Sequence, residues 1–333
     1  MHKLAHHRDS SGLRPAERDT IPIHSKGNTM KNPKIHTIDL NFLRIPQTIA
    51  VYLIPHQKGA ALIECGPGST IPTLTQALAA RQLAPQDITD VFVTHIHLDH
   101  AGSAGWWARQ GARIHVHHIG GPHLIDPSKL IASARRIYGS LMDQLWGELL
   151  PIPPDQVNLL QDNDEIHFGD WMLKALDTPG HANHHMSYLL DGVCFSGDVG
   201  GVHLPGVPAV RLPTVPPEFH IEKWRQSIQR FRSETIHTFA TTHFGLHEDA
   251  RWHLDAIERE LNEIEKWTAD TMSRNPSKEE FRDLFARWIN LKSKQTGLSS
   301  EMIGAYDTAI SSQMSADGIF RYWHKHKRTE LSG

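Results

Sequence analysis

The sequence predicts an α/β (α+β) domain that is followed by an all-helical C-terminal region. Short apolar segments of strand length alternate with helical patterns up to about residue 246, and several of them end in a turn that carries histidine or aspartate. From residue 247 onward the patterns are helical only. We therefore expect three parts, which are a flexible N-terminal extension, a mixed globular domain and a helical cap or dimerisation region, at residues 1–33, 34–246 and 247–333.

The amino-acid composition limits the classes of protein to which the chain can belong. The 333 residues are 39% hydrophobic and 8% aromatic, as in a soluble globular protein. Lys plus Arg is 34 and Asp plus Glu is 37, so the formal net charge is −3. A net charge of this sign does not favour binding to nucleic acid. No apolar run approaches the roughly 18–20 residues of a membrane span. The two cysteines, Cys65 and Cys194, make no disulfide framework, so a reducing cytoplasm is the expected compartment.

The N-terminal part divides into a tail and two strands. Residues 1–33 are polar, aperiodic and without the apolar core of roughly 7–15 residues that a secretory signal needs, so we expect a flexible tail. Residues 47–54 and 59–64 predict two strands, and residues 70–82 predict a helix. Glu64 ends the second strand just before a glycine turn. We expect its carboxylate to support a site from behind rather than to be a solvated rim group.

The most informative stretch follows the predicted strand at residues 88–93. It contains His95, His97, Asp99 and His100, three imidazoles and a carboxylate within six residues. These are the nitrogen and oxygen ligands that Zn, Fe and Mn accept. His95 and His97 can share one metal, while Asp99 and His100 fall on the next turn of the loop and can serve a second. A solvated polar loop is the alternative interpretation. Ser103 is a possible cap of the helix that follows.

The middle of the chain predicts further strands and one long helix. Strands are expected at residues 112–117 and 171–176, with a polar turn around residues 162–164, and a helix is expected at residues 128–146. Five side chains here could border a site, each with an equal case for packing or surface exposure: His118, Tyr138, Trp146, His184 and His185. His185 could also support metal ligands from behind.

The pattern of a strand followed by a ligand-type side chain repeats three more times. His181, Asp198 and His243 each follow an apolar segment and a turn. Strands packed side by side would bring all these ends to one edge of a sheet, which predicts a single metal site. Cys194 lies inside one of the apolar segments and is expected in the core.

The C-terminal region shows three amphipathic stripes, within residues 254–264, 281–288 and 302–314. Ser277 and Glu280 are spaced as a capping box before the second stripe. The apolar faces need a partner surface. It is either the preceding domain, with the helices as a cap over the site, or a second subunit, which makes a homodimer plausible.

The ordered motifs resemble those of the metallo-β-lactamase-fold hydrolases, the group that includes glyoxalase II-type thioesterases and lactonases. The resemblance rests on Thr94-His95-Ile96-His97-Leu98-Asp99-His100, Pro179-Gly180-His181, Ser196-Gly197-Asp198 and Thr242-His243-Phe244-Gly245, and it runs from about residue 40 to 245. It implies a four-layer αββα sandwich with the metals at one edge, and it makes residues 34–246 the catalytic domain. Glu64 departs from the aspartate that is common before the glycine turn.

The resemblance also implies roles for seven residues. His95, His97 and His181 would hold a first metal, Asp99, His100 and His243 a second, and Asp198 would bridge them. Two divalent cations are expected, zinc first, with iron or manganese also fitting the ligands. In such two-metal sites a metal-bound hydroxide attacks a carbonyl, and Asp99 could shuttle the proton to the leaving group.

The expected activity is therefore hydrolysis of an ester-like bond in a small molecule, with a thioester or a lactone first. One alternative is a mononuclear-iron sulfur (persulfide) dioxygenase on the same fold. Another is a regulatory, partner-binding protein whose helical tail occludes the site. No nucleic-acid or membrane partner is expected.

Overall fold

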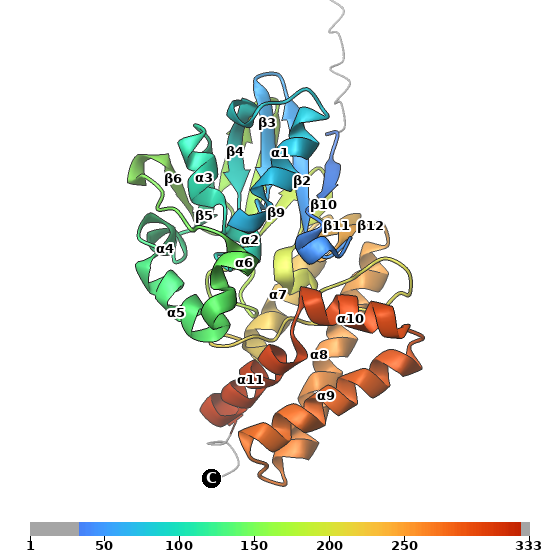
Figure 1. Cartoon of the computed structure of the whole chain (residues 1–333). Helices are drawn as coiled ribbons and strands as arrows, with labels where there is room; N and C mark the ends of the chain where they lie inside the picture. The colour runs from blue at the N-terminus through green and yellow to red at the C-terminus, as the bar shows by residue number, and fades with distance from the viewer. Residues whose placement is uncertain (1–32, 328–333) are drawn as a thin grey trace, which may run out of the picture. The chain divides into compact units, whose positions relative to one another are not determined.

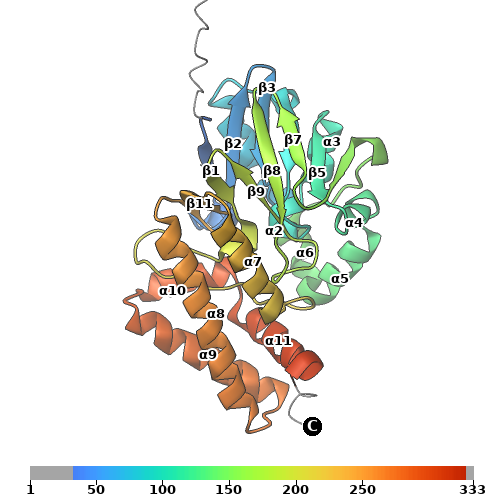
Figure 2. The ribbon, with the colours of Figure 1, turned by 180° about the vertical axis from the view of Figure 1, so that it is seen from behind.

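Two six-stranded sheets form the centre of the computed structural model, which describes residues 33–327 (Figures 1 and 2). The predicted N-terminal extension lies almost wholly outside these residues. Both sheets mix parallel and antiparallel pairs, and apolar β-branched and aromatic residues fill their strands. Among residues 33–327, no helix has the length and apolar character needed to cross a membrane.

The first sheet follows the chain order β1-β2-β3-β4-β5-β6. The first two pairs are antiparallel and the next three are parallel. Its strands are β1 (His36–Asp39), β2 (Ala50–His56), β3 (Gly59–Ile63), β4 (Ile88–Phe92), β5 (Arg113–His117) and β6 (Val157–Leu160). The predicted strands at 47–54, 59–64, 88–93 and 112–117 are confirmed, with ends that differ by up to three residues.

The second sheet has the order β12-β11-β10-β9-β8-β7, in which only β10 and β11 are parallel. Its strands are β7 (Glu165–Phe168), β8 (Trp171–Asp177), β9 (Met186–Leu190), β10 (Val193–Phe195), β11 (Thr238–Thr241) and β12 (Gly245–His247). The polar turn at residues 162–164 is confirmed, and it carries the chain from the first sheet to the second. Periodicity does not reveal the two short edge strands, β1 and β12, because three or four residues show too little of it.

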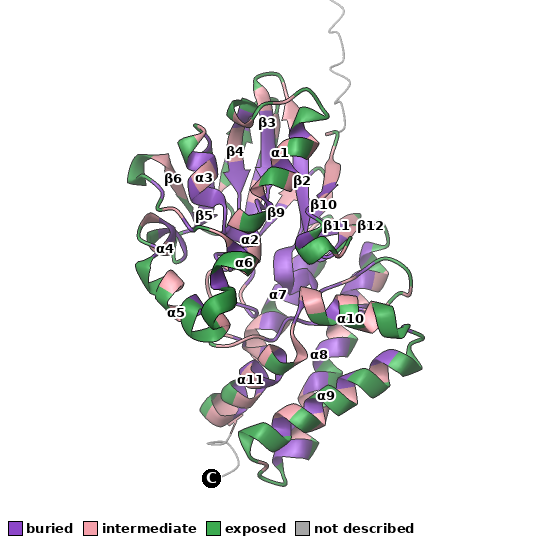
Figure 3. Ribbon diagram, viewed as in Figure 1, coloured by how far each residue is buried: buried purple, intermediate pink, exposed green. Residues whose placement is uncertain are grey.

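Three cores show why the sheets stack in layers. Alternate residues of β2 point to opposite faces, so that Val51 and Leu53 join the outer core of the first sheet while Tyr52 and Ile54 join the core between the sheets. The outer face of the second sheet packs on α7 and α8. The central strands β2, β3 and β9 are therefore largely buried on both faces, whereas the edge strand β7 alternates exposed and buried residues (Figure 3). This is the predicted four-layer αββα sandwich.

Helices cover both outer faces. Those between residues 33 and 235 are α1 (Ile71–Ala79), α2 (Leu98–Ala101), α3 (Ala104–Arg109), α4 (Gly121–Ile125), α5 (Ser128–Tyr138), α6 (Met142–Trp146) and α7 (Ile221–Ser233). The predicted helix at 128–146 is broken, since Gly139 adopts a φ of +54° between α5 and α6. Ser103 precedes α3, but its hydroxyl donates to the Cys65 carbonyl instead of capping the helix.

Within the described residues, four α-helices follow the sandwich, where the sequence shows three stripes: α8 (Ala250–Met272), α9 (Lys278–Gln295), α10 (Ser300–Ala309) and α11 (Ser312–Tyr322). The third stripe crosses the break between α10 and α11, where the Ser311 hydroxyl accepts from Met314 N and starts a new helix. The capping box of Ser277 and Glu280 is confirmed. These helices gather at the lower end of the sheets in Figure 1.

Candidate metal centre

The seven predicted ligands come from the ends of strands in both sheets. His95 to His100 follow β4 of the first sheet, whereas His181, Asp198 and His243 follow β8, β10 and β11 of the second. The expectation that one sheet edge would carry them all is wrong, since the site lies where the ends of two stacked sheets meet. Asp99 and His100 lie in the short helix α2 rather than in a loop.

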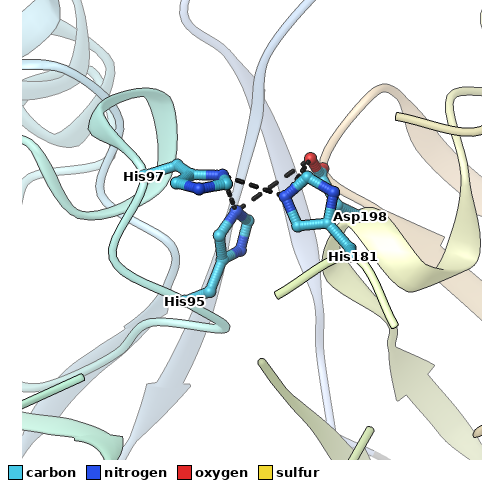
Figure 4. Close-up of side chains that lie close together, drawn as sticks. All are labelled: His95, His97, His181 and Asp198. Atoms are coloured by element: carbon cyan, nitrogen blue, oxygen red, sulfur yellow. Dashed lines mark hydrogen bonds and ion pairs between the residues drawn. The ribbon is translucent and has the colours of Figure 1, made fainter. Parts of the chain in front are cut away.

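Three imidazoles of the first group converge on one point (Figure 4). His97 Nδ1 lies 2.9 Å from both His95 Nε2 and His181 Nε2. The three ring planes are nearly perpendicular to one another, at 80°, 74° and 79°. Since the lone pair of an imidazole nitrogen lies in its ring plane, this arrangement directs all three toward a common centre. Asp198 Oδ2 completes the group at 3.3 Å from His181 Nε2 and 4.0 Å from His95 Nε2.

The second group faces the other oxygen of Asp198. Asp198 Oδ1 lies 3.2 Å from His100 Nε2 and 3.5 Å from His243 Nε2. Asp99 Oδ2 lies 3.6 Å and 3.4 Å from the same two nitrogens. One carboxylate therefore stands between two donor sets, with one oxygen turned to each. All seven sequence-predicted residues are brought together.

Hydrogen bonds to backbone carbonyls fix which nitrogen of His181 and of His243 is free. His181 Nδ1 donates to the Pro213 carbonyl and His243 Nδ1 donates to the Thr48 carbonyl, each at 2.6 Å. A carbonyl only accepts, so the proton is on Nδ1 and the Nε2 lone pair faces the site. Such outer partners set the tautomer and orientation of metal-binding histidines.

Glu64 fixes the orientation of two further histidines, His100 directly and His95 through Thr94. Its Oε1 accepts from His100 Nδ1 at 2.9 Å and from the Thr94 hydroxyl at 2.6 Å. Because the Thr94 proton is committed to Glu64, its oxygen accepts from His95 Nδ1 at 3.0 Å. Glu64 is 1% exposed, so it is not a solvated rim group. Its expected position behind the site is confirmed.

His185 holds Asp198 in place. Its Nε2 accepts from the backbone N–H of Asp198 at 3.2 Å, and its Nδ1 lies 2.9 Å from the Thr178 hydroxyl. Gly197 must be glycine, because its φ is +49° and a Cβ would lie 2.6 Å from both His185 Nε2 and Thr94 Oγ1. His185 therefore acts through Asp198, as one of its two sequence-based interpretations proposed.

Burial and neighbouring groups set the charge of the site. Burial, reinforced by neighbouring imidazoles, lowers the pKa of His95 and His97 well below the ordinary value, so both imidazoles are neutral, the form that can bind a metal. Burial raises the pKa of Asp198, but His100 and His181 outweigh it and hold that pKa well below its usual range. Burial lowers the pKa of His100, yet the surrounding carboxylates prevail and raise it. The carboxylates around His100 thus stabilise a positive charge at its ring.

The donor atoms fit divalent cations. His100 Nε2 and Asp198 Oδ1 are buried and face each other, but neither has a hydrogen-bond partner. A buried polar atom without a partner is costly, and a cation between these atoms would satisfy both. Five imidazoles and two carboxylates are also the borderline and hard ligands that Zn, Fe and Mn take.

A further histidine group shows the opposite geometry. His203, His247 and His253 also offer ligand atoms within 4.8 Å of one another. However, their rings are nearly parallel, at 7°, 24° and 18°. Lone pairs of parallel rings do not converge on one point, so we interpret this group as an aromatic stack. Sequence reasoning does not single out these three residues.

The other side chains that the sequence placed near the site differ in position. Tyr138 is close enough to Asp99 that burial and this carboxylate both raise the pKa of its hydroxyl. Trp146 is buried and packs against Tyr138 and Phe42. The His184 ring lies 5.8 Å from that of His97, and burial lowers its pKa to about 4. His118 is exposed and stacks on its neighbour in sequence.

Comparison with known proteins agrees with this arrangement. Residues 44–243 match the model of the metallo-beta-lactamase superfamily. The metallo-beta-lactamase fold-containing protein ST1585 of Sulfurisphaera tokodaii is 26% identical over 205 residues, which are 59% of this chain and 72% of that protein. Hydroxyacylglutathione hydrolase of Aeromonas hydrophila is 28% identical over 148 residues, which are 44% of this chain and only 45% of that enzyme.

Solved structures share this fold. The crystal structure of the archaeal ST1585 protein aligns with a TM-score of 0.56 at 25% identity, covering 70% of this chain and 87% of that one. The metallo-beta-lactamase family protein TTHA1429 of Thermus thermophilus aligns with a TM-score of 0.59 at 19% identity, covering 87% of this chain and 93% of that one. The second likeness concerns the fold alone.

Proposed function

The chain belongs to the metallo-beta-lactamase superfamily, and we propose that it is a binuclear metal-dependent hydrolase of an ester-like bond in a small molecule. The observation that carries this proposal is the position of Asp198, whose Oδ2 faces one donor set and whose Oδ1 faces the other. A bridging carboxylate between two complete sets is the arrangement that two-metal hydrolases use.

Each residue has a defined part in holding the ions. His95, His97 and His181 would hold the first cation, and Asp99, His100 and His243 the second, with Asp198 shared. When bound, such cations lower the pKa of water toward about 7 and polarise a substrate carbonyl. Glu64 and His185 keep the donor atoms aimed at the two positions. They reduce the reorganisation that substrate binding and reaction would otherwise require.

Asp99 is the proposed proton carrier. Its side chain is 21% exposed, while those of Asp198 and of the His ligands in ion-pair range are at most 6% exposed, so it can reach substrate. Burial raises the pKa of Asp99, but His100 and His243 prevail and lower it to about 2. Asp99 is thus ionised at neutral pH and can accept a proton and pass it to the leaving group.

Thiols of this chain are not needed as nucleophiles. Cys65 and Cys194 are both fully buried, and burial raises the pKa of Cys65 to about 12. A thiol with that pKa supplies almost no thiolate at neutral pH. The nucleophile of the proposed reaction is therefore water.

A thioester is the first substrate class to test. The similarity to a protein named hydroxyacylglutathione hydrolase supports this choice, although the match spans less than half of that enzyme. A lactone is the second class, because the proposed chemistry also opens a cyclic ester.

The sulfur dioxygenase alternative requires one iron on the first donor set only. The second set speaks against it, since His100 and His243 are each held by an acceptor on Nδ1 with Nε2 turned inward. Positioning of this kind is unexpected for ligands that no longer bind a metal.

The test is a substrate panel on metal-loaded protein, with S-D-lactoylglutathione, acyl-homoserine lactones, a β-lactam and a phosphodiester. We expect turnover of a thioester or lactone and its loss in Asp99→Asn. Oxygen uptake with glutathione persulfide, without hydrolysis in the panel, would instead select the dioxygenase.

A further inference from the structure

Arg211 carries a buried charge outside the metal centre. Arg211 is 7% exposed, and it lies just before Pro213, whose carbonyl orients His181. A guanidinium stays protonated in proteins. Among residues 33–327, no carboxylate oxygen lies within 4.0 Å of a guanidinium nitrogen of Arg211, so the side chain makes no ion pair there. Buried charges are normally paired, because taking a lone ion out of water is costly.

The contacts of Arg211 hold it in place but do not neutralise it. Nη2 donates a hydrogen bond to the Ser293 hydroxyl at 2.7 Å, and that hydroxyl donates its own hydrogen bond to the Ile289 carbonyl. The guanidinium carbon lies 4.8 Å from the centre of the Tyr306 ring. Nε is buried and has no hydrogen-bond partner. The guanidinium is therefore fixed, charged and left with an unused donor.

This side chain lines a cavity of about 140 Å³ between α8, α9 and residues 208–211. Apolar side chains of Val210, Ala256, Ile289 and Leu298 form part of the wall. One water takes up about 30 Å³ in the liquid, so the space holds a molecule of several heavy atoms. The cavity combines an apolar wall with a fixed cation, as small-ligand sites do.

The charged groups of the wall do not cancel. Arg211, Arg259 and Lys292 give three positive charges, and Glu260 and Glu263 give two negative ones. Both carboxylates bind Lys292, Glu263 at 2.6 Å and Glu260 by a short contact. One positive charge is left over, which matches a ligand with a single negative charge.

We propose that this cavity binds a small monocarboxylate with a short apolar body. The carboxylate would accept from the Arg211 guanidinium, and the hydrocarbon part would lie against Ala256 and Leu298. The planar fork of arginine matches a carboxylate in shape as well as charge. The site is independent of the proposed hydrolysis, because none of its residues belongs to the metal-ligand set.

The competing interpretation is that the protein itself balances Arg211, since the carboxylates of Asp307 and Glu260 both stabilise its charged form from beyond ion-pair distance. Glu260 is buried and lines the same cavity. In that case the cavity is already neutralised by the protein, and an added carboxylate gains nothing by entering it. The two interpretations differ in how affinity responds to single charges of the wall.

The experiment is calorimetric titration of the full-length, metal-loaded protein with sodium butyrate, with sodium chloride as the reference salt. Two variants change the wall charge in opposite directions. Arg259→Gln removes a cation of the wall and should weaken butyrate binding by roughly three- to tenfold. Glu263→Gln removes a half-exposed carboxylate and should tighten binding by a similar factor.

Arg211→Gln should abolish binding, and the two other wall variants keep the test valid if that protein does not fold. Arg287→Gln, an exposed arginine on α9 that donates to its own helix, is the matched control and should leave affinity unchanged. Butyrate bound at the metal centre would not distinguish Arg259→Gln from Glu263→Gln. No binding to the native protein, or equal affinity in both variants, would overturn the proposal.

Discussion

Glu64 Oε1 accepts a hydrogen bond from His100 Nδ1 at 2.9 Å, inside the sandwich and away from water. The same oxygen accepts from Thr94 and Thr242, so one carboxylate orients groups that follow β4 and β11. Since β4 and β11 belong to different sheets, Glu64 also ties together the two halves of the proposed metal centre. Metal binding should therefore depend on this single buried carboxylate.

Glu64→Gln should lower metal affinity roughly 10- to 100-fold, the usual cost of losing the outer partner of a ligating histidine. The amide carries no charge to support His100 and can present a donor where three donors already point. The measurement is competition with a chromophoric chelator. Glu165→Gln, an exposed glutamate of β7, is the control and should bind metal as the native protein does.

Gly318→Ala should destabilise the protein and weaken metal binding. A Cβ at this position of α11 would lie 1.9 Å from the Thr214 carbonyl oxygen, next to the Pro213 carbonyl that orients His181. We expect a loss of about 1–3 kcal/mol in unfolding free energy, from overpacking.

Gly304→Ala is the matched control, because a Cβ there in α10 meets nothing within 4 Å. It should be neutral or stabilise by up to about 1 kcal/mol, through helix propensity. Equal denaturant midpoints for the two variants would show that α11 does not support the site.

The stack of His203, His247 and His253 should make stability depend on pH. Burial, with contributions from neighbouring imidazoles, lowers the pKa of His203 and His253 to about 3, and burial lowers that of His247 to about 4. In the unfolded chain each titrates near 6.5, so the unfolded state binds more protons below that pH. Stability is therefore complete above about pH 6.5 and falls as the pH drops toward 4.

His253→Phe should reduce this dependence. It removes one buried titrating group, and the new ring can stack on Phe239 as the imidazole does at 4.9 Å. Between pH 6 and 4 the slope of unfolding free energy should decrease by about 1.4 kcal/mol per pH unit. Denaturant unfolding at several pH values measures this slope, and parallel curves for the two proteins would contradict the account.

Tyr138→Phe should affect turnover but not metal content. Burial and the Asp99 carboxylate both raise the pKa of the Tyr138 hydroxyl, and that hydroxyl donates to the Met314 thioether at 3.8 Å, which is a weak acceptor. Its proton is thus available to a substrate. We expect kcat/KM to fall roughly tenfold, as for one lost hydrogen bond to the transition state. Unchanged kcat/KM on an active substrate would assign Tyr138 to packing alone.

Sequence reasoning identifies the residues of the proposed metal centre because their chemistry is local. His95 to His100 lie together in the chain, and His181, Asp198 and His243 each follow a short apolar segment and a turn. Spacing cannot show that the strands belong to two sheets, since sheet membership depends on pairing between distant segments. For the same reason the stack of His203, His247 and His253 cannot be recognised from the sequence alone.

The helical tail shows a similar limit. Its stripes predict helices, and the capping box marks the start of α9, but the apolar periodicity continues across Ile310 and conceals the break. The role of α11 behind Pro213 and Thr214 depends on a close approach at Gly318, which has no signature in a single sequence. Likewise, the buried Arg211 looks like any surface arginine until its surroundings are known.

The central claim is that seven residues hold two divalent cations, and elemental mass spectrometry of the untagged protein tests it most directly. A His97→Ala, Asp198→Ala double variant, checked for folding by circular dichroism, controls for metal on other histidines. The account predicts close to two metal ions per native chain and their loss in the variant. One ion per chain, or equal metal content in the folded variant, would contradict it.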